Sequence, residues 1–135
     1  MQTPEVFVIA PTTRELQPVL EAVQRAAVEA GFTIARFDQH PPGAMVTSRI
    51  LDRIRQADLI IADVSRQNSN VMYELGFAHA LRKPTILLLN IKSGDSKLPA
   101  DLAGFAYFPY DPADLGRLAL RLGLEMKAVT MQRSA

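Results

Sequence analysis

The chain alternates short apolar runs typical of β-strands with longer stretches that carry apolar residues at helical spacing, from one end to the other. Such alternation favours a parallel sheet whose strands are joined by right-handed crossover helices on both faces. Five strands are predicted, at residues 5–11, 32–38, 58–64, 85–90 and 105–110. The run DLIIADV, residues 58–64, is almost continuously apolar, as a strand covered on both faces must be.

Helices are predicted between these strands and after the last one. The first should carry Pro18 in its first turn and end at Gly31, with a core-facing stripe of Leu20, Val23, Ala27 and Ala30. A second helix is expected at about 47–56, with Ile50, Leu51 and Ile54 turned inward, and a third at about 70–82. The last helix should begin near Asp111 as N-cap, with Pro112 at its first position.

With 135 residues, the chain suits one domain with one core, spanning 1–135 with a frayed tail at about 128–135. Five strands fit a single flavodoxin-like (Rossmann-like) α/β domain with strand order 2-1-3-4-5. In such sheets, ligands bind beyond the carboxyl ends of the strands, where the strand order reverses between the first and third strands.

Composition excludes several classes of function. The formal charge is only +1, without a long basic run, which argues against a nucleic-acid or membrane-surface partner. The chain has no cysteine and only two histidines, so thiolate and histidine-rich metal sites are not expected, and we predict no metal and no cofactor. Neither a signal peptide nor a membrane span is evident, which favours a cytoplasmic protein. The glycine patterns of dinucleotide-binding folds and P-loops are absent.

Two carboxylates, Asp63 and Glu74, lie in or beside the loops that border the predicted switch point. At 3.6 residues per turn, Glu74 shares a stripe with Phe77 and Ala78, so we expect it at the start of the buried helix face, in the first turn. Apolar neighbours would raise its pKa, whereas the helix N-terminus would lower it. An ionised carboxylate poorly shielded by water would suit attack on carbon or stabilisation of a developing positive charge.

Structural roles explain some of the same residues. A glutamate in the first turn stabilises a helix by roughly 0.3–1 kcal/mol. Asn68, Ser69 and Asn70 are all suitable capping residues, and Asp63 is suited to closing the turn after its strand. The segment Thr12–Thr13–Arg14 can either hold a phosphate or order its loop. Pattern alone leaves the structural and catalytic interpretations of Glu74 open.

The segment ADLIIADVSRQNSNVMYELGFAHALRKPTILL, residues 57–88, strongly resembles the core of nucleoside 2-deoxyribosyltransferase-like proteins and their TIR-like relatives. The shared pattern is an apolar strand ending in Asp, then Asn-x-Asn-Val, Tyr-Glu-Leu-Gly and a Lys-Pro before the next strand. Flanking segments extend the resemblance over about residues 6–122. Typical deoxyribosyltransferases carry an Asp and a Gly where this chain has Asn68, Ser69 and Asn70, and a Gly after the first strand, so the TIR-like branch matches better.

The resemblance implies cleavage or transfer at the N-glycosidic bond of a nucleoside or nucleotide, with Glu74 as nucleophile or oxocarbenium stabiliser. It implies that Asp63 is a base- or sugar-binding carboxylate or proton donor, and that Asn70 and Tyr73 orient Glu74 or the sugar. The full set of substrate-binding residues that we predict is Thr12, Thr13, Arg14, Asp38, Ser65, Asn68, Asn70 and Tyr73. Pockets in this superfamily are often completed by a second subunit, so a homo-oligomer is expected.

Three alternatives differ in what they predict. A TIR-like NAD hydrolase would release nicotinamide from NAD by means of the same glutamate. A nucleotide-binding or interaction module would bind a nucleotide without releasing a base. A flavodoxin-type electron carrier fits the strand order, but the chain lacks the aromatic-rich, acidic loops expected around a flavin.

Overall fold

A computed structural model describes residues 2–11, 13–36, 46–93, 102 and 104–134. Its five parallel strands form one sheet in the order β2-β1-β3-β4-β5, which confirms the predicted flavodoxin-like topology. The strands are β1 Glu5–Ile9, β2 Thr33–Arg36, β3 Leu59–Asp63, β4 Thr85–Asn90 and β5 Ala106–Tyr110. The helices are η1 Arg14–Leu16, α1 Gln17–Glu29, α2 Val46–Gln56, α3 Ser69–Ala80 and α4 Leu115–Ser134.

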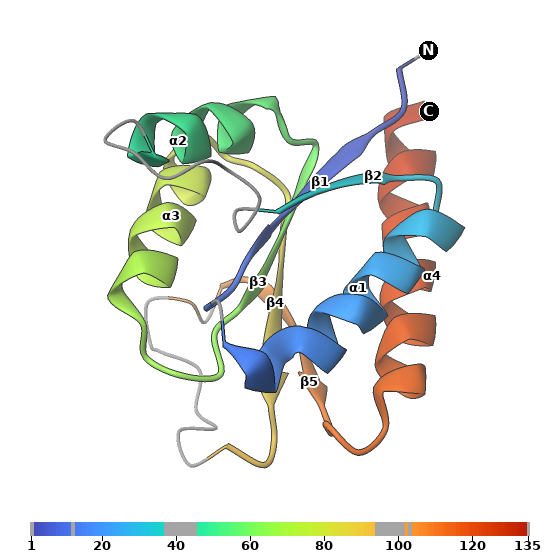
Figure 1. Cartoon of the computed structure of the whole chain (residues 1–135). Coiled ribbons are helices and arrows are strands. Elements are labelled where there is room, and N and C mark those ends of the chain that lie inside the picture. Colours follow the sequence, from blue (N-terminus) through green and yellow to red (C-terminus); the bar gives the residue numbers. More distant parts are fainter. Residues whose placement is uncertain (1, 12, 37–45, 94–101, 103, 135) are drawn as a thin grey trace.

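The sheet separates two helical layers: α1 and α4 cover one face, and α2 and α3 cover the other (Figure 1). Strand β3 is buried along its whole length and divides its side chains between the two layers. Leu59 and Ile61 join the core under α1 and α4, whereas Ile60 and Ala62 join the core under α2 and α3. Because strand side chains alternate, Asp63 continues the first set and lies on the α1/α4 face.

Helices α1 and α3 end in the same way, with one residue in the left-handed conformation. Gly31, with a φ of 83°, follows α1 as predicted. After α3 the equivalent residue is Arg82, with a φ of 56°. The Arg82 N–H donates to the carbonyl of His79, and the Lys83 N–H donates to that of Ala78. These are the two hydrogen bonds of a Schellman motif, which satisfies the last carbonyls of the helix.

Lys83 also connects two segments. Its ammonium group donates to the carbonyl of Arg55, at 2.6 Å, and to that of Ala57, at 2.9 Å. Both carbonyls lie at the C-terminal end of α2, where a positive charge is favourable. Lys83, which precedes Pro84 and β4, is therefore hydrogen-bonded to the end of α2.

We expect the Lys83→Met variant to lose about 1–2 kcal/mol of unfolding free energy, because two carbonyls lose a charged donor. Urea unfolding followed by circular dichroism measures this change. Lys127→Met, at an exposed position of α4, is the matched control and should stay within about 0.5 kcal/mol of wild type. Equal stability of the two variants would contradict this role for Lys83.

The start of α4 differs from the prediction. Asp111 accepts a hydrogen bond from the N–H of Ala113 and closes a turn, so Pro112 lies before the helix rather than in its first turn. The carboxylate of Asp114 accepts from the N–H of Arg117 and acts as the N-cap. Helix α4 continues as far as Ser134 and Val129 packs against the core, so residues 128–134 of the predicted frayed tail are helical.

Candidate functional site

Helix α3 begins at Ser69 because Asn68 caps it. The Asn68 side chain accepts a hydrogen bond from the N–H of Val71 at 3.0 Å. The capping interpretation of Asn68 is therefore confirmed. Glu74 then falls in the second turn of α3, so its predicted place in the first turn is wrong. The stabilising effect of a helix N-terminus on a negative charge falls off within the first turn, so Glu74 gains little from it.

Glu74 points into the protein, as predicted, and only 9% of its surface is exposed. Its neighbours on the same helix face, Val71, Leu75 and Ala78, belong to the core under α2 and α3. No hydrogen bond or ion pair to its carboxyl group is formed by the residues that the structure describes. Burial raises the pKa of Glu74 from its ordinary value of 4.5 to about 7. Near neutral pH, both the protonated and the ionised forms are therefore populated.

Asp63 lies at the carboxyl end of β3 and is 3% exposed. One of its oxygens accepts from the N–H of Ser65, at 2.9 Å, and the other accepts from the hydroxyl of Tyr110, at 2.7 Å. The Ser65 hydroxyl oxygen in turn accepts from the N–H of Asn90 at 2.8 Å. Burial, and then the charge of Asp63, raise the pKa of the Tyr110 hydroxyl. The network joins the carboxyl ends of β3, β4 and β5.

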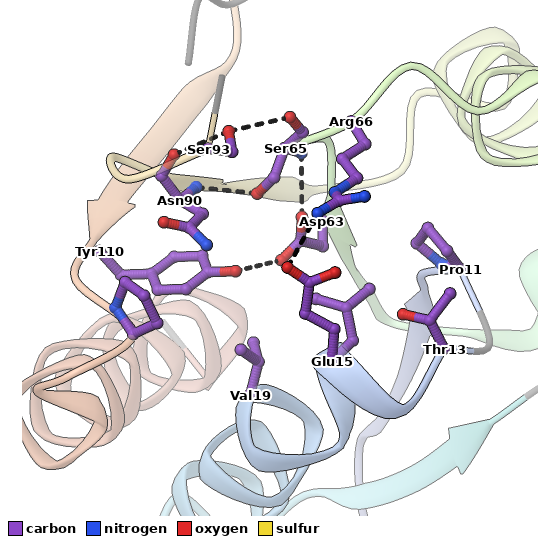
Figure 2. Close-up of a pocket in the computed structure, with 12 residues that line it drawn as sticks. Pro11, Thr13, Glu15, Val19, Asp63, Ser65, Arg66, Asn90, Ser93 and Tyr110 are labelled. Carbon is purple, nitrogen blue, oxygen red and sulfur yellow. Dashed lines mark hydrogen bonds and ion pairs between the residues drawn. The ribbon is translucent and has the colours of Figure 1, made fainter. Parts of the chain in front are cut away.

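A pocket of about 130 Å³ opens beside this network (Figure 2). Its residues come from the ends of β3, β4 and β5 and the loops after them, from the loop after β1, from η1 and from the start of α1. They are Pro11, Thr13, Glu15, Leu16, Val19, Asp63, Ser65, Arg66, Asn90, Ser93, Tyr110 and Pro112. At its rim, the Arg66 guanidinium pairs with the Glu15 carboxylate at 2.9 Å. We call this cavity the Asp63 pocket.

Asp63 and Glu74 are not paired across one cavity. Asp63 bonds to Tyr110, which belongs to the core under α1 and α4, whereas Glu74 lies on α3, which covers the opposite face. Glu74 is not among the residues that line the Asp63 pocket. The two carboxyl groups therefore approach the sheet from opposite sides, an arrangement that spacing along the sequence did not reveal.

The other predicted site residues lie in different places: some line the Asp63 pocket, and others are exposed. Thr13 and Ser65 line the Asp63 pocket, whereas Arg14 is exposed and does not line it. Asn70 and Tyr73 are exposed on α3, and Tyr73 is 61% exposed. Thr12 and Asp38 lie outside the described residues. The proposed roles of these residues toward a substrate stay predictions.

Several polar residues of the Asp63 pocket escaped sequence reasoning, among them Glu15, Arg66, Asn90 and Tyr110. A signal for two of them was present, because Asn90 and Tyr110 end strands β4 and β5 just as Asp63 ends β3. Side chains at the carboxyl edge of a parallel sheet are brought together by the topology. The Glu15–Arg66 pair joins residues 51 positions apart and has no signal in the sequence.

Residues 2–112 match the family described as the TIR domain of CAP12/Pycsar effector proteins. The chain belongs to this family of TIR domains. No curated protein matches it in sequence. Within the described ranges, no group of three histidine or acidic side chains is placed to hold a metal ion, and no helix is long and apolar enough to cross a membrane.

Solved structures share the fold of this TIR domain at low identity. The CMP N-glycosidase BcmB of Clostridium botulinum is 24% identical, with a TM-score of 0.65 over 87% of this chain and 98% of its own. A 2-deoxyribosyltransferase of Bacillus psychrosaccharolyticus is 20% identical, with a TM-score of 0.62 over 82% and 89%. The flavodoxin-like domain of a Synechococcus protein is 13% identical, with a TM-score of 0.60 over 95% and 99%. The predicted membership of the TIR-like proteins is confirmed, and the glycosidase and the deoxyribosyltransferase share the fold.

Proposed function

We propose that this TIR domain cleaves or transfers the N-glycosidic bond of a nucleoside or nucleotide, with Glu74 acting at the anomeric carbon. The observation that carries the proposal is the buried carboxyl group of Glu74, whose pKa of about 7 keeps an ionised form available at neutral pH. Helix α3 contacts both β1 and β3, the strands between which the sheet order reverses. Two proteins that share the fold, by their names, act on the same kind of bond.

The chemistry follows from a weakly hydrated carboxylate beside a sugar. As the bond from the anomeric carbon to the base breaks, positive charge develops on the sugar ring. The ionised form of Glu74 stabilises this charge or forms a bond to the carbon. The base leaves with the bonding electrons and takes up a proton. Water or a second base then attacks the same carbon, which distinguishes hydrolysis from transfer.

A positive charge developing next to Glu74 also favours its ionised form. Without substrate, the carboxyl group of Glu74 is therefore partly protonated near pH 7. Substrate binding shifts it toward the ionised form, which is the form that reacts. In this proposal Asp63 has no contact with the reacting atoms, because it faces the opposite side of the sheet.

A second candidate is NAD hydrolysis. It is favoured because this chain belongs to a family of TIR domains, and some TIR-type enzymes cleave NAD. It uses the same glutamate and differs in the leaving group, which is nicotinamide. A third, a nucleotide-binding module, shares the fold and would bind a nucleotide without breaking its glycosidic bond.

We expect free base to appear when the wild-type protein is incubated with the correct substrate from a panel of purine and pyrimidine nucleosides, their 5′-monophosphates and NAD. Liquid chromatography of each mixture names the substrate. A parallel series of incubations contains a second free base as well. Transfer then yields a new nucleoside, whereas hydrolysis does not. Nicotinamide release from NAD alone would establish the second candidate. No base from any compound would overturn the proposed activity.

A further inference from the structure

The Asp63 pocket carries an inference that is independent of the activity proposed for Glu74. It lies on the α1/α4 side of the sheet and has a floor of buried polar groups. Figure 2 shows Tyr110, Ser65 and the Glu15–Arg66 pair converging on the space around Asp63. A cavity with a few convergent polar groups among apolar walls is the usual form of a small-molecule site.

The charges around the pocket decide what kind of ligand suits it. Three charged side chains line it, the carboxylates of Asp63 and Glu15 and the guanidinium of Arg66. Arg66 is paired with Glu15, so the negative charge of Asp63 has no cationic partner in the described part of the chain. An anion such as phosphate would be repelled by a lining with a net charge of −1, whereas a monocation would neutralise it.

The hydrogen bonds of Asp63 also favour a cationic ligand, because its carboxylate can accept further N–H groups. Asp63 accepts one bond at each oxygen, from Ser65 and Tyr110, and each carboxylate oxygen can accept a second. The apolar walls formed by Pro11, Leu16 and Val19 suit the carbon part of a ligand. The volume of about 130 Å³ is below the 300–1,000 Å³ of typical drug-sized sites, which restricts the ligand to a small one.

We infer that the Asp63 pocket is a binding site for a small organic cation, a primary ammonium or guanidinium compound whose N–H groups donate to the Asp63 carboxylate. The Glu15–Arg66 pair closes the rim. The side chains of Arg66 and Glu15 are 65% and 60% exposed, and such a pair contributes about 0–1 kcal/mol, so it opens readily. In the open state, the Glu15 carboxylate is free to accept a further N–H of the cation.

Titration of the ¹⁵N-labelled protein with isobutylammonium and with methylguanidinium tests the site by NMR. At least one cation should shift the amide signals of Ser65, Asn90 and Tyr110 saturably, at millimolar concentrations. The neutral counterparts, isobutanol and methylurea, should bind at least tenfold more weakly, and inorganic phosphate should cause no saturable shift. Equal binding of the neutral compounds, binding of phosphate instead, or no saturable shift with either cation would overturn the inference.

Two variants locate the binding. Asp63→Asn keeps the shape of the side chain and should weaken cation binding at least tenfold. If it does not fold, Thr13→Trp serves instead, because Thr13 is exposed at the pocket and a large ring there should exclude the cation. Gln17→Trp, at an exposed position of α1 outside the lining, is its control and should bind as wild type does. Wild-type affinity in the Thr13→Trp variant would contradict the location.

Discussion

Replacement of Glu74 by glutamine should reduce base release on the order of 10³-fold while the protein stays folded. Glutamine has nearly the shape of glutamate but carries no negative charge, and its amide cannot form the bond to the anomeric carbon. The loss should appear in kcat, because the charge acts where positive charge develops during the reaction. Chromatographic initial rates with the substrate found in the panel measure it.

The matched control is Glu21→Gln, which makes the same chemical change at an exposed position of α1. Its rate should stay within twofold of wild type. Full activity in the Glu74→Gln variant would remove Glu74 from the reaction. Loss of activity in both variants would point to an effect on the whole protein. Near-UV circular dichroism of each variant shows whether the fold is retained.

Much of this fold could be predicted because local patterns and topology agree. The apolar run of β3 indicated a strand covered on both faces, Gly31 marked the end of α1, and the five alternating units favoured a parallel sheet. The exact starts of α3 and α4 were less predictable, since several neighbouring residues are able to cap. Asn68 and Asp114 act as N-caps, whereas Asn70 and Asp111 were equally suitable by type.

The candidate site was predictable only in part. Helical periodicity placed Glu74 on the buried face, and the structure confirms its burial. Its pKa was not predictable, because desolvation and the helix N-terminus oppose each other and only the packing around α3 decides between them. Nor could the sequence show that Asp63 and Glu74 face opposite sides of the sheet. That separation depends on which face of the sheet each helix covers and on which face the last side chain of β3 points to.

A buried carboxyl group that serves chemistry should lower stability, and the same Glu74→Gln variant tests this without any substrate. At pH 8.5 the variant should be more stable than wild type by about 1–3 kcal/mol. The pKa of Glu74 rises from 4.5 in the unfolded chain to about 7 in the folded protein, where each pH unit corresponds to about 1.4 kcal/mol. Residual contact of the carboxyl group with water reduces the full value.

The sign of the effect follows from proton binding. Between pH 4.5 and about 7 the folded protein holds a proton on Glu74 that the unfolded chain has lost. Raising the pH through this window therefore destabilises wild type, whereas glutamine does not titrate. Below pH 4.5 both states of wild type are mostly protonated, so the pH-dependent part of the difference between the two proteins should vanish.

Urea unfolding at pH 4, 5.5, 7 and 8.5 gives the free energy of unfolding for wild type, Glu74→Gln and the exposed control Glu21→Gln. The gap between wild type and Glu74→Gln should widen from pH 4 through pH 7 and level off by pH 8.5, while the control remains within about 0.5 kcal/mol throughout. A gap that does not change with pH would mean that the pKa of Glu74 is the same in the folded and unfolded chains. Together with lost turnover in the same variant, the widening gap would show that this carboxyl group is kept at a cost to stability because the chemistry requires it.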